Sequence, residues 1–329
     1  MKYSLIIPVY NRPNEVAELL ESLTTQTRTD FEVVVVEDGS SVSCKRVVEA
    51  YADQLNLHYF EKPNSGPGQT RNYGAERSRG DYLLILDSDC VIPPNYLSAI
   101  DAFLETNQVD AFGGPDRAHD SFTSLQKAIS YAMTSFFTTG GIRGGKKKLD
   151  KFYPRSFNMG VRASVYKALG GFSKMRFGED IDFSIRIFKE KYRCELIPDA
   201  WVWHKRRTDF RKFFKQVHNS GIARINLYKK YPESLKLVHL LPMVFTLGVV
   251  GLLLCSVFCL WSLLPLGLFA LLIFIDASVA ERSVVIGGEA VVASFVQLLG
   301  YGTGFLRSWW QRCVLGKEDF EAFKTTFYK

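Results

Sequence analysis

The chain has 329 residues, of which 47% are hydrophobic, and it carries a formal net charge of +7. This length allows more than one domain, and some apolar runs are too long for the core helices of a soluble protein. The six cysteines show no spacing typical of a zinc site, so we expect reduced thiols in a cytosolic setting. Composition therefore excludes a disulfide-stapled secreted domain and favours a cytosolic domain joined to a membrane-associated part.

The N-terminal part alternates predicted strands and helices. Apolar strands are predicted over residues 2–10, 31–36, 57–61 and 82–86. After the first strand, Pro13 suits the first turn of a helix whose apolar residues recur at helical spacing. Strands separated by helices of about ten to fifteen residues predict right-handed crossovers and a parallel sheet.

Two carboxylates directly follow the fourth predicted strand. The motif is Asp87-Ser88-Asp89, and it ends the apolar run from Tyr82 to Leu86. Open α/β sheets bind their ligands in the crevice beyond the strand ends. Carboxylate oxygens there suit Mn²⁺ or Mg²⁺ bridging to phosphate, although a motif this short also fits an ordinary turn. The other motifs of the chain decide between these two interpretations.

The glycine fingerprints of many nucleotide-binding proteins are missing. The segment from Asn64 to Gly68 opens a predicted helix but matches neither G-x-G-x-x-G nor the P-loop pattern. An NAD-dependent enzyme or a P-loop ATPase is therefore disfavoured, and a metal and single side chains must hold any phosphates. The Gly- and Lys-rich residues 142–155 predict a loop, either a lid over an anionic substrate or a solvated surface loop.

A basic segment precedes the apolar runs. Residues 205–236 contain ten Lys or Arg and two acids, a net charge of +8 against +7 for the whole chain. Within it, residues 208–228 have the pattern of an amphipathic helix, which suits a membrane surface or packing on the N-terminal domain. Basic residues beside apolar spans mark the cytoplasmic side of a membrane. We therefore expect the membrane, and not nucleic acid, as the partner of this segment.

Three apolar runs follow, over residues 237–261, 263–275 and 284–306. The first is long enough to cross a bilayer as a helix, and the second spans one only if it extends to Ala280. The third is broken by glycines and Glu289, so it fits a third span, a re-entrant segment or an interfacial helix. Basic residues after it and the lack of a signal peptide predict two crossings of the inner, cytoplasmic membrane, with the N-terminal domain in the cytoplasm.

Four segments form an ordered set in the N-terminal domain. They run from Ser4 to Arg12, from Val35 to Ser40, from Gly66 to Asp89, and from Gly178 to Asp182. Together, over about residues 3–205, they resemble the family 2 glycosyltransferases. The resemblance implies an α/β catalytic domain with the GT-A fold, Rossmann-like and mostly parallel, followed by C-terminal transmembrane or interfacial helices. It also implies a nucleotide-sugar donor.

The resemblance assigns the nucleotide of that donor to residues near the first strands. Pro8, Tyr10 and Asn11 match positions that line the base pocket. Asp38 matches an acid that contacts uracil, and Arg71 matches a basic residue at the nucleotide. The alternative for Asp38 is a purely structural role in a turn at a strand end.

For the diphosphate, the resemblance implies a bound Mn²⁺ or Mg²⁺ that offsets the charge growing on the leaving group. Asp87 matches a metal ligand that also approaches the ribose, Ser88 belongs to the same nucleotide-sugar motif, and Asp89 matches the firmer metal ligand. His204 resembles a histidine that closes over the metal or diphosphate. A structural histidine at the domain edge is the alternative for His204.

A pair of acids opens the helix predicted over residues 181–192. Asp180 matches the general base of inverting members, which takes the proton of the attacking acceptor hydroxyl, and Glu179 supports it. Acids in a first helical turn also stabilise the helix dipole, so a purely structural role is the alternative. Residues 158–160 and 170–172 match the acceptor-side segments of the family.

We therefore expect an inverting, metal-dependent hexosyltransferase that acts on a membrane-associated, glycan or lipid-linked acceptor, as in surface polysaccharide or glycolipid synthesis. No Q-x-x-R-W motif follows the acidic pair, which counts against a processive polymerase. The alternatives are a sugar nucleotidyltransferase and a non-catalytic membrane scaffold. The expected domains are a catalytic domain (1–205), a basic interfacial segment (206–236), a membrane region (237–306) and a cytoplasmic tail (307–329).

Overall fold

The structure is a computed structural model that describes the chain except for residues 118, 120–121, 141–151, 176, 206 and 318–329. Residues 142–151 of the expected loop therefore lie outside the described residues. The contacts divide the chain into two compact units. Unit 1 contains residues 1–117 and 152–204, and unit 2 contains residues 118–151 and 205–319.

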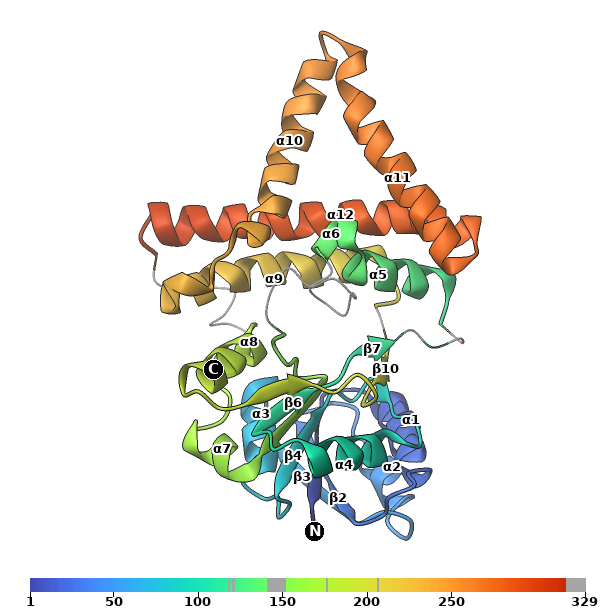
Figure 1. Cartoon of the computed structure of the whole chain (residues 1–329), viewed down its shortest axis with the longest axis vertical. Helices are drawn as coiled ribbons and strands as arrows, with labels where there is room; N and C mark the ends of the chain where they lie inside the picture. The colour runs from blue at the N-terminus through green and yellow to red at the C-terminus, as the bar shows by residue number, and fades with distance from the viewer. Residues whose placement is uncertain (118, 120–121, 141–151, 176, 206, 318–329) are drawn as a thin grey trace. The chain divides into compact units, whose positions relative to one another are not determined.

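Unit 1 is built on a sheet in the order β3-β2-β1-β4-β8-β6-β9 (Figure 1). Its strands are β1 (Tyr3–Val9), β2 (Phe31–Asp38), β3 (Leu57–Lys62), β4 (Tyr82–Leu86), β6 (Ala111–Gly113), β8 (Asn158–Arg162) and β9 (Cys194–Leu196). The first four strands pair in parallel, which confirms the predicted mostly parallel sheet. β8 runs antiparallel to both of its neighbours, β4 and β6.

The strands of this sheet are apolar because both faces are covered, as is usual for parallel sheets. All eight residues of β2 are buried, and so are all five of β4. The connecting helices of unit 1 are α1 (Pro13–Thr24), α2 (Lys45–Glu49), α3 (Pro67–Ala75), α4 (Tyr96–Thr106), α7 (Ala163–Ala168) and α8 (Glu179–Lys189). As predicted, α1 has Pro at its start and buries Val16, Leu19, Leu20 and Leu23.

A small second sheet, in the order β5-β10-β7, lies next to the end of β4 in sequence. Its strands are β5 (Cys90–Val91), β7 (Asp116–Arg117) and β10 (Val202–His204). The register pairs His204 with Cys90, so the last strand of the unit returns to the residue that follows Asp89. A glycine permits this close return, because a Cβ on Gly114 would lie 1.6 Å from the carbonyl oxygen of Ala200.

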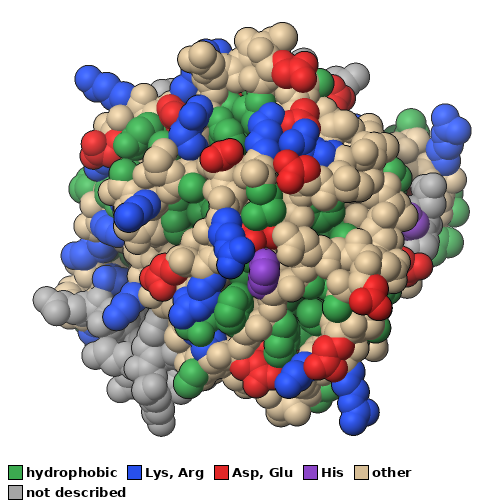
Figure 2. All heavy atoms as spheres, turned by 90° about the horizontal axis from the view of Figure 1, so that it is seen from below, with side chains coloured by type: hydrophobic (Ala, Val, Ile, Leu, Met, Phe, Trp, Pro, Cys, Tyr) green, Lys and Arg blue, Asp and Glu red, His purple; other side chains and the backbone are tan. Residues whose placement is uncertain are grey.

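The surface of unit 1 carries mixed charges. Figure 2 views the molecule from the end where the N-terminus lies in Figure 1, and Lys and Arg side chains are interspersed there with Asp and Glu. No field of one sign forms on this face. The basic excess of the chain lies instead in residues 205–236, with their net charge of +8.

Unit 2 is helical. It comprises α5 (Ser124–Thr134), α6 (Phe136–Thr139), α9 (Phe210–Lys230), α10 (Leu241–Ser256), α11 (Leu264–Glu281) and α12 (Val284–Trp309). The apolar face of α9, with Phe213 and Val217 buried, packs against α5 and α12. Sequence analysis left the membrane surface and the N-terminal domain as partners of this face, whereas the structure covers it with helices of unit 2.

The helix α12 is continuous through Gly287, Gly288 and Glu289, the residues that break the third apolar run of the sequence. It runs beside α9 in the same direction (Figure 1). A Cβ on Gly300 would lie 2.4 Å from Val217, and one on Gly304 would lie 2.0 Å from the carbonyl oxygen of His218. Glycines therefore allow the two helix backbones to approach closely.

Among the described residues, three helical segments are long and apolar enough to cross a membrane: Leu237–Ser256, Leu260–Glu281 and Val284–Val314. They differ in how much of their most apolar 18-residue stretch is buried in the protein. This share is 17% in the first segment and 11% in the second, but 44% in the third. In Figure 1, α10 and α11 rise as a pair from the layer formed by α5, α9 and α12.

The close contact between α9 and α12 can be tested with two glycines of the same helix. Gly304→Ala should lower the melting temperature of the detergent-extracted protein, since overpacking costs on the order of 1–3 kcal/mol. Gly288→Ala is the matched control, because no atom lies within 4 Å of its added Cβ and Ala is the better helix former. Equal melting temperatures for the two variants would contradict the packing described here.

Candidate active site

A buried guanidinium joins the two acidic segments. Arg71, on α3, is 3% exposed. Its Nη2 donates to Asp87 at 2.7 Å, and its Nη1 donates to Glu179 at 3.0 Å. The guanidinium also lies over the ring of Phe172, 5.4 Å from the ring centroid. The end of β4 and the beginning of α8, distant in sequence, thus meet at one cation.

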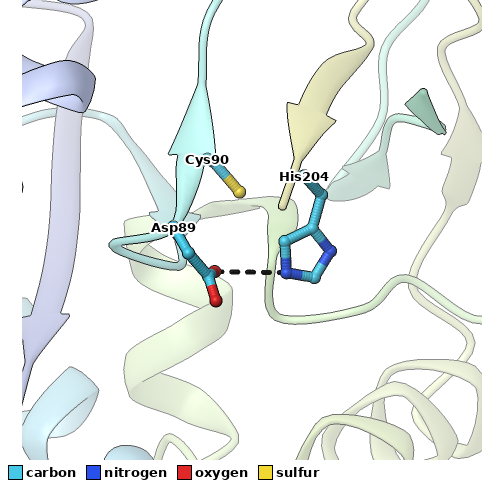
Figure 3. Close-up of side chains that lie close together, drawn as sticks. All are labelled: Asp89, Cys90 and His204. Carbon is cyan, nitrogen blue, oxygen red and sulfur yellow. Dashed lines mark ion pairs between the residues drawn. The ribbon is translucent and has the colours of Figure 1, made fainter. Parts of the chain in front are cut away.

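Asp89 lies beside two groups that carry or can carry positive charge. Arg12 Nη1 donates to one carboxylate oxygen, and His204 Nε2 lies 3.2 Å from the other (Figure 3). Burial raises the pKa of Asp89, but His204 and Arg12 outweigh it and hold that pKa well below its usual range. Asp89 is therefore an anion held in the interior of the site.

The residues at this point fit a divalent cation. Asp89, Cys90 and His204 bring one ligand atom each to within 4.8 Å of one another (Figure 3). Neighbouring ligands of an octahedral ion at 2.0–2.1 Å lie about 3.0 Å apart, close to the 3.2 Å between Asp89 and His204. His204 is held in place by stacking on Phe157, with ring centroids 4.9 Å apart.

Cys90 is a poor third ligand for a hard cation. Burial raises the pKa of its thiol well above the usual value, and the charges of Asp89 and Asp87 raise it further. The thiol Sγ donates to the carbonyl oxygen of Phe157 at 3.5 Å. Asp87, the other expected ligand, is bound to Arg71 and is not part of this cluster. Ser88, between the two acids, is 5% exposed.

The acids at the start of α8 have separate partners. Asp180 accepts the backbone N–H of Ile181 at 2.8 Å, and its other oxygen lies 2.8 Å from Nε of Arg155. Asp182 is fully buried and binds Arg186 and the hydroxyl of Ser173. Asp182 thus has a structural position, whereas Asp180 and Glu179 line the same region as Asp87.

Burial raises the pKa of Glu179 to about 7, although the positive charge of Arg71 opposes the rise and Asp180 adds to it. A carboxyl group whose pKa lies near neutrality can exchange a proton at physiological pH.

The residues expected at the nucleotide base lie around the ends of β1 and β2. Asn11 has a positive φ of 55°, and its Oδ1 accepts the backbone N–H groups of Ser41 and Val42. Asp38 binds Lys62 and accepts the backbone N–H groups of residues 65 and 66, both at 2.9 Å. Asn11 and Asp38 therefore fix the loops that follow these strands.

The other two expected base-pocket residues differ in exposure. Tyr10 is 53% exposed, and Pro8, near the end of β1, is partly buried. An exposed aromatic ring beyond a strand end is available for stacking on a base. The nucleotide-contacting roles of Pro8, Tyr10, Asn11, Asp38 and Arg71 stay predictions.

Sequence analysis missed the cations that hold the acids. Arg12, Lys62 and Arg155 contact Asp89, Asp38 and Asp180, respectively. Arg12 directly follows Asn11 in a segment that the family resemblance includes. No spacing in the sequence connects any of the three with its acid, since each pair joins different elements of the fold.

The raised pKa of Glu179 predicts a pH-dependent stability. From pH 4.5 to 7 the folded protein binds more protons at Glu179 than the unfolded chain, so stability falls as pH rises. A glutamine at position 179 does not titrate, so the Glu179→Gln variant lacks this contribution to the pH dependence of stability. The melting temperature of Glu179→Gln minus that of the wild type should therefore increase over this range, by the equivalent of about 3 kcal/mol. A pH-independent difference would contradict the raised pKa.

Comparisons with known proteins identify the family of this chain. The model of the family described as "Glycosyl transferase family 2" matches residues 4–170, about half of the chain. The poly(ribitol-phosphate) beta-N-acetylglucosaminyltransferase TarS of Staphylococcus aureus is 39% identical over 114 residues, which are 33% of this chain and 20% of TarS. An uncharacterised glycosyltransferase of Haemophilus influenzae is 30% identical over 57% of this chain and 62% of its own. The chain thus matches less than two thirds of these relatives' lengths.

Solved structures share the fold. The mannosyltransferase PcManGT of Pyrobaculum calidifontis, in complex with GDP-Man and Mn²⁺, has a TM-score of 0.67 at 18% identity, over 94% of this chain and 88% of its own. Residues 1–349 of S. aureus TarS, in complex with UDP-GlcNAc, have a TM-score of 0.50 at 20% identity, over 96% and 93%. These similarities confirm the predicted GT-A fold. Taken with the match to residues 4–170, they show that the chain belongs to glycosyltransferase family 2.

Proposed function

We propose that this chain transfers one sugar from a UDP-linked donor to a membrane-associated, glycan or lipid-linked acceptor, with inversion at the anomeric carbon. The observation that carries the proposal is the Arg71 guanidinium, bound to both Asp87 and Glu179. It brings the acids expected at the diphosphate next to the acids expected at the acceptor. A single displacement needs groups of both kinds on the two sides of one sugar.

Asp89 and His204 would hold the divalent cation, Mn²⁺ or Mg²⁺, with Asp87 at the nucleotide-sugar side. When bound, such an ion offsets negative charge on a leaving diphosphate without a proton transfer. TarS and PcManGT support a nucleotide-sugar donor, since their structures hold UDP-GlcNAc and GDP-Man, respectively. Asp38 and Tyr10 would contact the base, and the match of Asp38 to a uracil-contacting acid favours UDP.

Asp180 would act as the general base. Its Oδ2 would accept the proton of the acceptor hydroxyl as the oxygen attacks the anomeric carbon, once Arg155 has moved from its place 2.8 Å away. Glu179 would remain bound to Arg71 and keep the base in position. The catalytic domain would comprise residues 1–205, as the sequence analysis expects, with residues 118–151 contributing to the helical unit.

Asp180→Asn should reduce transfer by about 10²–10⁴-fold, because the amide cannot accept the proton. Binding of UDP with Mn²⁺, measured by calorimetry, should be unchanged. Asp199→Asn, an exposed acid in the same unit, is the control and should retain activity. Turnover near the wild-type rate in Asp180→Asn would remove this residue from the base role, and release of pyrophosphate instead of UDP would indicate nucleotidyl transfer.

The helical unit would attach the enzyme to the cytoplasmic face of the membrane, with α10 and α11 inside the bilayer and α12 along its surface. The basic helix α9, which packs against α12, supports this arrangement. Six Lys or Arg residues lie on α9, namely Arg211, Lys212, Lys215, Arg224, Lys229 and Lys230. Contacts between α12 and α9 continue as far as Arg312, which binds Asn226. A crossing α12 would draw these charges into hydrocarbon, at a cost of a few kcal/mol each.

This topology can be tested with Cys313, which is exposed just after α12. Cys194, Cys255 and Cys259 are replaced by Ser, and the buried Cys44 and Cys90 remain. A membrane-impermeant maleimide should label Cys313 in inside-out vesicles and leave it unlabelled in right-side-out vesicles. Labelling only in right-side-out vesicles would mean that α12 crosses the membrane.

A further inference from the structure

The side chain of Arg12 binds the same carboxylate, Asp89, that the candidate metal site uses. Arg12 connects β1 to α1, and its Nη1 binds Oδ2 of Asp89. The Arg12 side chain is 30% exposed and that of Asp89 is 10% exposed. The other oxygen of Asp89 faces His204. Both oxygens of this carboxylate therefore already have a positively charged or proton-bearing neighbour.

A guanidinium and a divalent cation that both bind this carboxylate repel each other. Both are positive, and the interior of the site screens charges less than water does. A cation that binds Asp89 therefore has to displace Arg12 or leave the two charges in contact. Arg12 competes with the metal for Asp89.

The side chain of Arg12 is less constrained than the backbone before it, since it is 30% exposed. The backbone before it is fixed, because Asn11 accepts the N–H groups of Ser41 and Val42. The partly exposed side chain can therefore rotate while the loop stays in place. A guanidinium that leaves a carboxylate next to a diphosphate can bind two phosphate oxygens at once.

We propose that Arg12 is an exchangeable counter-ion of Asp89: it neutralises the acid in the donor-free enzyme and moves to the donor diphosphate when a divalent cation takes the acid. This inference rests on the proposed function, since it requires a cation at Asp89 and a diphosphate in the donor. Arg12 is a positioning residue here. It makes metal binding weak without nucleotide and strong with it, so the ion and the donor bind together.

The test measures binding and not turnover. Mn²⁺ is titrated into the full-length, detergent-extracted protein without nucleotide, and free Mn²⁺ is followed by electron paramagnetic resonance. Arg12→Gln should bind Mn²⁺ about tenfold more tightly than the wild type, because a charged hydrogen bond that competes for Asp89 is gone. With Mn²⁺ saturating, the same variant should bind UDP several-fold more weakly by calorimetry. Unchanged or weaker Mn²⁺ binding in Arg12→Gln would overturn the proposal.

Two controls separate this inference from the proposed function. Asp89→Asn should lose Mn²⁺ binding; if it does not, the metal site itself is wrong. If Asp89→Asn loses binding and Arg12→Gln equals the wild type, only the role of Arg12 fails. Arg28→Gln is the matched control for removing a half-buried arginine, since Arg28 is 29% exposed and pairs with Asp101 instead. Arg12→Lys, which keeps the charge, should give intermediate Mn²⁺ affinity and serves if Arg12→Gln does not fold.

Discussion

The site depends on one buried cation. Arg71 is almost fully enclosed, and an arginine in the interior stays charged, so it needs its carboxylates to offset the loss of water. It has two, Asp87 at the end of β4 and Glu179 at the start of α8. Arg71 thereby fixes the distance between the end of β4 and the start of α8. The acidic site is therefore assembled when β4, α3 and α8 pack together in the folded unit 1.

The other acids of the site are also paired with cations of the protein. Asp38 has Lys62, Asp89 has Arg12 and His204, and Asp180 has Arg155. Each of these acids is thus held in place by a cation of the protein. Under the proposed function, binding of a phosphorylated donor would be an exchange of partners, in which cations of the protein pass from carboxylates to phosphates. Groups that are held in place in this way are preorganised, and less reorganisation would accompany the reaction.

The sequence was enough to predict the first strands and helix of unit 1, but not the ion pairs of its site. The strands β1 to β4 and the helix α1 were predictable, because continuous apolar runs and helical spacing are local signals. The antiparallel β8 was not, since no local signal in the sequence gives the direction of a strand in its sheet. Asp87, Asp89, Glu179 and Asp180 were found through the order of their motifs. Their cations were not, because an ion pair such as Arg12–Asp89 joins residues with no common periodicity.

Sequence periodicity also could not show what covers the helices of unit 2. The apolar stripe of α9 predicted an interface, but only the structure shows that α12 packs against it and that glycines of α12 allow the close approach. Gly287, Gly288 and Glu289 interrupt the apolar run in the sequence but not the helix. Gly300 and Gly304, which no sequence pattern marked, allow the close packing with α9.

The hairpin formed by α10 and α11 has one more consequence. No Asp, Glu, Lys or Arg lies between Lys236 and Asp276. An electric potential across a bilayer does work on a segment only in proportion to the charge that the segment carries through the field, about 2.3 kcal/mol per charge per 100 mV. The acids of α11, Asp276 and Glu281, lie at its C-terminal end, and residues 237–275 before them carry no formal charge. The depth at which these residues insert should therefore be the same in energised and de-energised membranes.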